Sequence, residues 1–286
     1  MTYLSAIILG IVQGVAEFLP ISSSGHLSIF QAFFGLSAGE DDVVFDVLLH
    51  LGTLAAVFAA YWNDICGLIH SFFALFKKEP VPEGRASARA AGRKKQEERL
   101  MQRMILLLII GTLPLILVPL YQDWVEGLYS NTFFIGAALI VTGVLLFVSD
   151  RIKKGSKNEK TASVMDALFV GISQAFAVVP GLSRSGTTIA AGLSRGFDRE
   201  FAMRFSFLMS IPAVIGANLL TLFDVIGTGI DAAAVPKYLV GMFVAAVTGY
   251  ASIRLLRYLA EKKSFDGFCY YCWGMGLLTL VLSLVK

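Results

Sequence analysis

Charged side chains are scarce in this chain of 286 residues. Asp, Glu, Lys and Arg together make up 16%, whereas 56% of the residues are hydrophobic and the mean hydropathy is +0.70. Soluble domains carry about 25% charged residues, so the composition excludes that class. The sequence predicts an all-α protein that crosses a membrane several times.

Cysteine and histidine are also rare, with three residues of each. No disulfide framework is therefore expected. Cys269 and Cys272 have CxxC spacing, but no second ligand pair accompanies them, so a zinc or redox site is disfavoured. No basic segment precedes the first apolar run, and no cleavable signal peptide is expected. The net charge of +3 gives no indication of nucleic-acid binding.

Apolar runs of spanning length, about 20 residues, occur six times. They lie near residues 47–62 with an extension to about 76, 104–121, 133–149, 205–222, 236–256 and 267–285. Two further apolar segments, 3–35 and 164–196, are interrupted by Pro, Gly and Ser before they reach that length. We expect these two segments to be re-entrant helical hairpins.

The two interrupted segments are copies of one another. A shift of 161 positions aligns Gly10–Gly25 (GIVQGVAEFLPISSSG) with Gly171–Gly186 (GISQAFAVVPGLSRSG), with identical residues at seven of sixteen positions. The chain is therefore predicted to form one integral membrane domain from two repeats, residues 1–150 and 151–286. Each repeat has one hairpin followed by three spans.

Basic residues are absent from alternate connections. Segments 36–46, 122–132 and 223–235 contain acids but no Lys or Arg, whereas segment 77–103 contains nine basic residues. Because Lys and Arg stay on the cytoplasmic side, both termini are expected outside, and the two hairpins enter from opposite faces. Such inverted repeats place binding sites near the midplane. Residues 77–100 are expected to form a mobile cytoplasmic loop.

The two hairpins differ in their polar side chains. The first carries Glu17, Ser23 and His26, and the second carries Arg184 and Thr187 where the first has Ser23 and His26. An ionisable residue inside a membrane costs about 2.5 to 3.5 kcal/mol on insertion scales, so Glu17 indicates a functional site. One alternative is that Glu17 only pairs with Arg184 and joins the hairpin tips. The surrounding hydroxyls argue against that pairing as the whole explanation.

Serines restart a helix after each proline, where they are good N-cap residues. Two helix N-termini that converge in a membrane form an anion site. With Arg184 as a fork-shaped donor, the expected ligand is a phosphate group, and two adjoining phosphates would use both helix ends. The predicted diphosphate-binding residues are Ser22, Ser24, Gly25, Ser183, Arg184, Ser185, Gly186 and Thr187.

Phosphate hydrolysis needs a nucleophile, a proton carrier and charge stabilisation. Ser23 or a water could attack, and Glu17 or His26 could carry the proton. Arg184 and a divalent cation would stabilise the transition state. The predicted catalytic residues are Glu17, Ser23, His26 and Arg184, and the predicted metal ligands are Glu17 and Gln13, which share one helix face. His50 and His70 lack such neighbours and are interpreted as structural.

Segments Gln13–Leu27 (QGVAEFLPISSSGHL) and Pro180–Thr188 (PGLSRSGTT) closely resemble the two signature motifs of the bacitracin-resistance family of undecaprenyl-diphosphate phosphatases. Phe45–Thr53 (FDVLLHLGT) fits the same family, so the resemblance covers nearly the whole chain. It implies an enzyme of the bacterial plasma membrane that hydrolyses this polyprenyl diphosphate lipid to its monophosphate and regenerates the carrier for cell-wall precursors.

The resemblance also implies which residues and ions take part. It implies functional roles for Glu17, Ser23, His26 and Arg184, an active site open to the outer face, and dependence on a divalent cation, usually Mg²⁺ or Ca²⁺. Gln13 occupies a position that the family fills with Glu or Gln. An amide brings no charge, which leaves metal binding at this position an open question.

Two other functions compete with hydrolysis. Inverted repeats and broken helices are typical of transporters, so movement of the polyprenyl phosphate carrier across the membrane is the alternative. Glu17, Ser23 and His26 favour hydrolysis, since a carrier needs no nucleophile with a proton carrier beside it. A scaffold role would not explain two polar hairpins. The nucleophile stays open between Ser23 and water, and a homodimer is one option for the oligomeric state.

Overall fold

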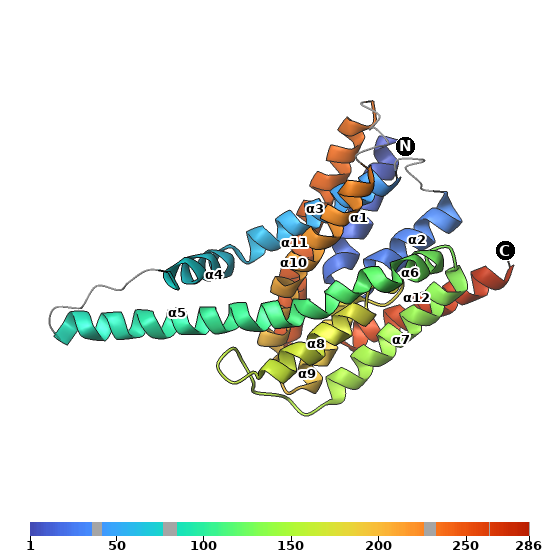
Figure 1. The fold of residues 1–286 in the computed structure, drawn as a ribbon. Coiled ribbons are helices and arrows are strands. Elements are labelled where there is room, and N and C mark those ends of the chain that lie inside the picture. The colour runs from blue at the N-terminus through green and yellow to red at the C-terminus, as the bar shows by residue number, and fades with distance from the viewer. Residues whose placement is uncertain (36–41, 77–84, 226–232, 263, 286) are drawn as a thin grey trace.

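The computed structural model describes residues 1–35, 42–76, 85–225, 233–262 and 264–285. Within these ranges the ordered elements are helices, and no β-strand occurs beyond one isolated bridge between Lys157 and Phe197. The helices form a bundle from which α4 and the first part of α5 extend to one side (Figure 1). The predicted all-α class is confirmed.

Long apolar helices make up most of the bundle. They are α3 (Asp42–Ala60), α5 (Arg85–Thr112), α7 (Thr132–Arg151), α10 (Arg199–Val225), α11 (Val235–Lys262) and α12 (Asp266–Val285). The described chain contains six segments that are long and apolar enough to cross a membrane, which is the number predicted from hydropathy. The protein is therefore a multi-pass membrane protein.

The first predicted span is shorter than expected. Residues 47–76 do not form one helix, because α3 ends at Ala60 and α4 (Trp62–Ala74) begins after Tyr61, which has a non-helical backbone. Tyr61 is fully buried, and its ring packs 5.9 Å from that of Phe207 and 4.1 Å from the guanidinium carbon of Arg257. These tertiary contacts interrupt a run that hydropathy alone joins.

Part of the predicted cytoplasmic loop is helical. Residues 77–84 lie outside the described ranges, but α5 begins at Arg85 and continues into the membrane-spanning part. The prediction of a loop through residue 100 is therefore wrong from Arg85 onward. Ala, Arg, Lys, Gln and Glu, which dominate the start of α5, are strong helix formers in spite of their polarity.

After Thr112 the helix α5 changes geometry. A 3₁₀ helix, η2 (Leu113–Tyr121), follows and leads into the short α6 (Gln122–Leu128). Pro114 and Pro119 lie in η2 and lack the backbone N–H that a regular helix requires. The predicted span 104–121 therefore consists of an α-helical and a 3₁₀ part.

Two pairs of short helices correspond to the repeated motifs. The first pair is α1 (Tyr3–Phe18) with α2 (Ser23–Phe34), and the second is α8 (Val164–Phe176) with α9 (Arg184–Ser194). The apolar arms α1 and α8 are shorter than the six candidate spans. Each pair has the predicted helix, turn and helix. Their re-entry into the membrane from opposite faces stays a prediction.

The two halves of the chain pack in matched pairs. Helix α1 lies along α11 and α8 lies along α5, while α3 packs on α10 and α7 packs on α12. The equivalent glycines of the repeat lie at two of these contacts: a Cβ on Gly10 would lie 2.6 Å from the carbonyl oxygen of Gly241, and one on Gly171 would lie 2.2 Å from that of Gly111. A two-fold relation between repeats would produce this pairing, and the repeat boundaries themselves stay a prediction.

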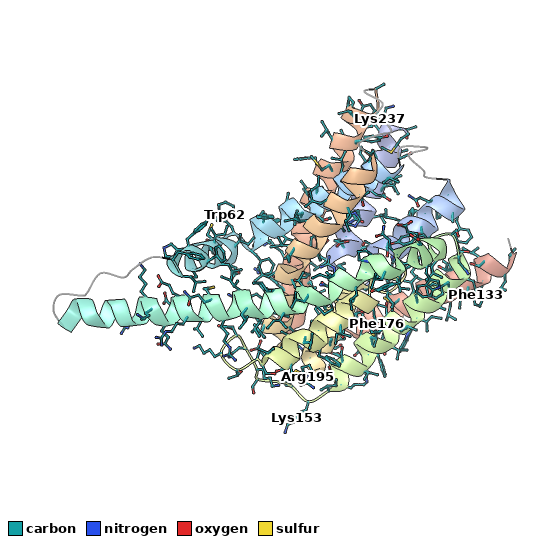
Figure 2. The ribbon with its side chains drawn as sticks, in the orientation of Figure 1. Trp62, Phe133, Lys153, Phe176, Arg195 and Lys237 are labelled. Carbon is teal, nitrogen blue, oxygen red and sulfur yellow. The ribbon has the colours of Figure 1, made fainter. Side chains whose placement is uncertain are left out.

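Labelled basic residues mark the two ends of the bundle. Figure 2 places Lys153 and Arg195 at the lower end, whereas Lys237 lies at the upper end. In Figure 1 the N-terminus lies at the upper right and the C-terminus at the right edge, about halfway down the bundle. The connection after α7 and the end of α9, where basic residues gather, therefore lie away from the termini.

Candidate active site

The tips of the two helix pairs meet inside the bundle. A Cβ on Gly25 would lie 3.0 Å from the Cα of Gly181, and one on Gly186 would lie 3.2 Å from the Cβ of Pro20. Gly181 has a φ of +90°, a conformation that L side chains rarely adopt. The N-termini of α2 and α9 therefore converge, as the sequence predicts.

Equivalent serines cap both of these helices. The hydroxyl oxygen of Ser22 accepts from the N–H of Gly25 at 3.2 Å, and that of Ser183 accepts from the N–H of Gly186 at 3.1 Å. The predicted capping role is confirmed for this pair. Direct contact of Ser22 or Ser183 with a phosphate stays a prediction.

Glu17 is the centre of a buried polar cluster. The hydroxyl of Ser23 donates to its Oε2 at 2.6 Å, and the side-chain N–H of Gln13 donates to the same oxygen at 3.2 Å. The guanidinium of Arg184, from the other half of the chain, forms an ion pair with Oε1. Glu17 is only 8% exposed. The structure thus brings together three of the four predicted catalytic residues and the predicted second metal ligand.

Several buried polar atoms around this cluster lack a partner among the described residues. They are the Oε1 of Gln13, the Nη1 of Arg184 and the hydroxyl of Thr187. An unpaired buried polar group costs about 1 to 3 kcal/mol, and more when it is charged. An arginine N–H and a threonine hydroxyl can both donate to phosphate oxygens. These unpaired donors are therefore consistent with the predicted phosphate site.

His26 faces away from the Glu17 cluster. Its Nδ1 lies 2.7 Å from the carbonyl oxygen of Ser22, and its Nε2 lies 2.8 Å from the hydroxyl of Tyr271 on α12. Both ring nitrogens are therefore engaged, and neither bonds to Ser23 or Glu17. In this geometry the group that accepts the proton of Ser23 is Glu17.

Two residues that contact the site were not predicted from the sequence. Thr142, on α7, donates to the carbonyl oxygen of Gly181 and accepts from the N–H of Ser183, both at 3.1 Å. Tyr271 contacts His26 as described above. Both belong to apolar spans outside the repeated motifs, and Tyr271 lies between the cysteines of the CxxC spacing at Cys269 and Cys272. Only a polar side chain at a buried helix position could have drawn attention to them.

The surroundings of Glu17 also include a residue outside the two hairpins. His50 lies near Glu17, and its Nδ1 bonds the carbonyl oxygen of Asp46 at 2.8 Å as a structural histidine would. His50 was interpreted as structural from the sequence, which did not predict that it lies near Glu17.

The donor set at Glu17 fits a hard divalent cation. The described residues contain no group of three or more His, Cys, Asp or Glu that could form a metal cage. The side chains of Glu17 and Gln13 nevertheless contact one another, and the Oε1 of Gln13 has no partner among the described residues. Mg²⁺ is commonly held by one or two protein oxygens together with waters and substrate phosphates, and a carboxylate with a nearby amide oxygen is compatible with such a site.

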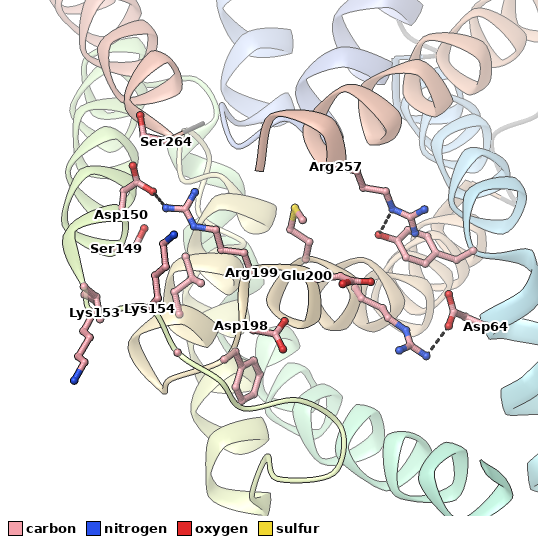
Figure 3. A pocket seen from close by; sticks show the side chains of 17 residues that line it. Asp64, Ser149, Asp150, Lys153, Lys154, Asp198, Arg199, Glu200, Arg257 and Ser264 are labelled. Atoms are coloured by element: carbon pink, nitrogen blue, oxygen red, sulfur yellow. Dashed lines mark hydrogen bonds and ion pairs between the residues drawn. The ribbon is translucent and has the colours of Figure 1, made fainter. Parts of the chain in front are cut away.

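A cavity of about 950 Å³ lies apart from this cluster and is lined by both acids and bases (Figure 3). Arg199 pairs with Asp150 there, and Arg204 pairs with Asp64 at 2.6 Å. None of the predicted site residues lines it. Because most of its arginines already have partners in the protein, this region is best explained as a set of contacts that join the helices.

Fold and site together define a class: a helical membrane protein with a buried polar centre where two broken helix pairs meet. Residues 6–278 match the family described as Bacitracin resistance protein BacA, and the chain belongs to that family. The resemblance seen in the motifs is thereby confirmed.

Curated relatives match along almost their entire length. An undecaprenyl-diphosphatase of Methanosphaera stadtmanae is 43% identical over 295 residues, covering 99% of this chain and 98% of the relative. Proteins of the same name from Methanobrevibacter smithii and Halothermothrix orenii are 40% and 37% identical, each covering 99% of both chains.

Proposed function

We propose that this protein hydrolyses undecaprenyl diphosphate to undecaprenyl phosphate and inorganic phosphate. Family membership over residues 6–278 and full-length relatives named undecaprenyl-diphosphatase support this activity. The reaction recycles the lipid carrier for cell-wall synthesis and fits the bacitracin resistance for which the family is described. The observation within the site that carries the proposal is the hydrogen bond from Ser23 to Glu17.

Glu17 is placed to accept the proton of the nucleophile. The 2.6 Å contact directs the hydroxyl hydrogen of Ser23 at the Glu17 carboxylate, so attack by Ser23 on phosphorus passes that proton to Glu17. A water held between the same carboxylate and the substrate would lose its proton in the same way. In either case the bond from the terminal phosphorus to the bridging oxygen breaks, and the lipid monophosphate leaves with that oxygen. Attack by water gives inorganic phosphate directly, whereas attack by Ser23 leaves the phosphoryl group on its hydroxyl, and a water then cleaves that ester to release inorganic phosphate.

Charge on the diphosphate is balanced by Arg184 and by two helix ends. One arm of the Arg184 guanidinium pairs with Glu17, while Nη1 has no partner among the described residues and can donate to a phosphate oxygen. The N-termini of α2 and α9 add free backbone N–H groups and the positive ends of their dipoles. This arrangement supports binding of both phosphates at the point where the hairpins meet.

A bound divalent cation would be held by Glu17 and Gln13. It would neutralise part of the phosphate charge and polarise the phosphorus–oxygen bonds. Because Gln13 is neutral, the site contributes one negative charge from this pair, and the substrate supplies the remaining oxygens. Mg²⁺ and Ca²⁺ both prefer such oxygen ligands.

The proposed site opens to the outer face of the membrane. The distribution of Lys and Arg among the connections supports this orientation, since the acidic connections and both termini then lie outside. The same argument supports opposite membrane faces for the two hairpins. Residues Glu17, Ser23 and His26 would lie on the hairpin that enters from outside.

The Ser23 contact also distinguishes hydrolysis from lipid transport. A carrier that only moves a lipid phosphate needs donors such as Arg184 and Thr187, but it gains nothing from a hydroxyl bonded to a carboxylate. Ser23 and Glu17 make that bond at 2.6 Å. The arrangement therefore favours hydrolysis over the transport alternative.

Phosphate release from undecaprenyl diphosphate by the purified protein, in detergent with Mg²⁺, tests the proposal. Glu17→Gln keeps the size of the side chain but removes the proton acceptor, so release should fall by about 100-fold or more. Glu126→Gln is the matched control, because Glu126 is exposed on α6 and its carboxylate accepts from Gln122 at 2.7 Å, outside the Glu17 cluster. Its rate should equal that of the wild type. Equal rates for wild type and Glu17→Gln would contradict the assignment of Glu17.

A further inference from the structure

Helix α12 supports the first hairpin through two successive side chains. The hydroxyl of Tyr271 lies 2.8 Å from Nε2 of His26, and the two rings are nearly parallel, with an interplanar angle of 9° and centroids 5.6 Å apart. The thiol of Cys272 donates to the carbonyl oxygen of Pro20 at 3.6 Å. The position of α12 therefore determines how His26 is held.

The proton positions on His26 follow from its partners. Nδ1 lies 2.7 Å from the carbonyl oxygen of Ser22, which can only accept, so Nδ1 carries a hydrogen. Nε2 is then the nitrogen that gains and loses a proton. A tyrosine hydroxyl can donate to neutral Nε2 and can accept from protonated Nε2. Tyr271 therefore satisfies His26 in both protonation states.

We propose that Tyr271 is a positioning residue for His26 in the proposed hydrolysis, holding the ring plane and bonding the titrating nitrogen in both states. This role rests on the proposed function. Packing alone does not account for a tyrosine here, since phenylalanine would stack equally well on the ring. His26 is only 3% exposed, and without Tyr271 its Nε2 would be a buried polar atom with no partner in the described chain.

The neighbouring tyrosine provides a matched control. Tyr270 lies one position earlier on α12, is 60% exposed, and packs its ring 5.8 Å from that of Trp273. It makes no hydrogen bond to His26. Tyr271→Phe and Tyr270→Phe therefore remove the same atom from adjacent positions of one helix, and only the first removes the contact with His26.

The kinetic test compares these two variants with His26→Ala and with the double variant His26→Ala/Tyr271→Phe. Tyr271→Phe should lower kcat about tenfold, the equivalent of one hydrogen bond, with KM within about twofold of wild type. Tyr270→Phe should match the wild type. The double variant should be no slower than His26→Ala, since Tyr271 acts through His26. The limb of the pH profile that His26→Ala removes should be displaced in Tyr271→Phe and unchanged in Tyr270→Phe.

A spectroscopic readout is independent of turnover. The chain has three histidines, so ¹⁵N signals of labelled imidazoles can be assigned by their loss in His26→Ala. Tyr271→Phe should shift the Nε2 signal of His26, and Tyr270→Phe should leave it in place. The role of Tyr271 would be overturned if the wild type is active and Tyr271→Phe has wild-type kinetics and an unmoved Nε2 signal. A wild type that releases no phosphate would overturn the proposed function and this role with it.

Discussion

At the scale of single residues, Glu17 and Arg184 connect the two hairpin tips. They come from opposite halves of the chain and form a buried ion pair at the hairpin tips. Removing one partner of such a pair leaves an uncompensated buried charge, which costs about 3 to 5 kcal/mol. The pair therefore joins the two halves and also holds the Glu17 carboxylate beside Ser23, so its structural role is compatible with the proposed catalytic role.

Thr142 is expected to affect activity although it belongs to neither hairpin. Thr142→Val keeps the shape but leaves the carbonyl of Gly181 and the N–H of Ser183 without their buried partner, which loosens the turn before Arg184. We expect kcat/KM for undecaprenyl diphosphate to fall about tenfold or more, as for one or two lost hydrogen bonds. Steady-state phosphate release measures this.

Thr279→Val is the control for Thr142→Val. Thr279 is equally buried, but its hydroxyl only bonds back to the carbonyl of Met275 in its own helix at 2.7 Å. This variant should keep wild-type kcat/KM, and Thr142→Ser should recover most of the activity lost in the valine variant. Equal losses at Thr142 and Thr279 would indicate a general loss of stability instead of an effect on the hairpin.

Single site residues could be predicted from sequence where a polar residue stands out from the apolar segment around it. Glu17, Ser23 and Arg184 could be found because they are polar residues in apolar segments that occur twice, and the structure brings all three together. Tyr271 and Thr142 could not, because a tyrosine or threonine in an apolar span is common and their partners are distant in sequence. The contact of His26 with Tyr271 instead of Ser23 depends on tertiary packing that no local pattern contains.

At the scale of elements, the closest helix contacts depend on glycine, which has no side chain to keep the helices apart. A Cβ at position 171 of α8 would lie 2.2 Å from the carbonyl oxygen of Gly111 on α5, so Gly171→Ala must separate the two helices. We expect destabilisation by about 1 to 3 kcal/mol, seen as a lower melting temperature in detergent.

Gly274→Ala is the matched control on another apolar helix, α12. A Cβ at Gly274 would meet nothing within 4 Å. Because alanine favours a helix over glycine by up to about 1 kcal/mol, this variant should melt at the same temperature as the wild type or slightly higher. A lower melting temperature for Gly274→Ala than for Gly171→Ala would contradict the packing argument.

Asp166 anchors the start of α8 outside the six spans. Its carboxylate accepts from Lys157 at 2.8 Å, from Arg195 at 2.8 Å and from the N–H of Ser163 at 2.9 Å. Burial alone would raise the pKa of Asp166, but the hydrogen bonds from Lys157, Ser163 and Arg195 outweigh it and lower the pKa from 3.8 to about 2. The second hairpin is thereby attached to the segments before and after it.

This lowered pKa predicts a pH-dependent contribution to stability. The ionised carboxylate stabilises the fold fully above its unfolded pKa of 3.8, and the contribution is lost as pH falls toward about 2. Asp166→Asn should therefore melt below the wild type at pH 7, and the difference should narrow between about pH 4 and pH 2. Asp123→Asn, at an exposed position on α6, should show no difference at either pH. A constant difference across this pH range would contradict the role of the charge.

Element boundaries were predicted well where apolar runs were uninterrupted and less well elsewhere. The six spans and the two helix pairs follow from hydropathy and from Pro, Gly and Ser. The helical start of α5 was missed because its polarity suggested a loop, although its residues favour helix. The break at Tyr61 was missed because it depends on Phe207 and Arg257, which lie far along the chain.

At the scale of the whole molecule, one helix pair supports both hairpins. Helices α7 and α12 pack closely, and a Cβ on Gly136 would lie 3.0 Å from the carbonyl oxygen of Gly276. Thr142 of α7 holds the turn of the second hairpin, and Tyr271 of α12 holds His26 of the first. A change in the α7–α12 contact would therefore move both halves of the site together.

The orientation of the whole molecule can be tested with two engineered cysteines. Cys66 is exposed and must first be replaced, for example by Cys66→Ser. In that background, Asp123→Cys on α6 should react with an impermeant thiol reagent in intact cells, while Lys95→Cys on α5 should react only after the membrane is opened. The reason is that the basic start of α5 is retained in the cytoplasm whereas the acidic connection around α6 is exported. The opposite labelling would place the first hairpin, and with it Glu17 and Ser23, on the cytoplasmic face.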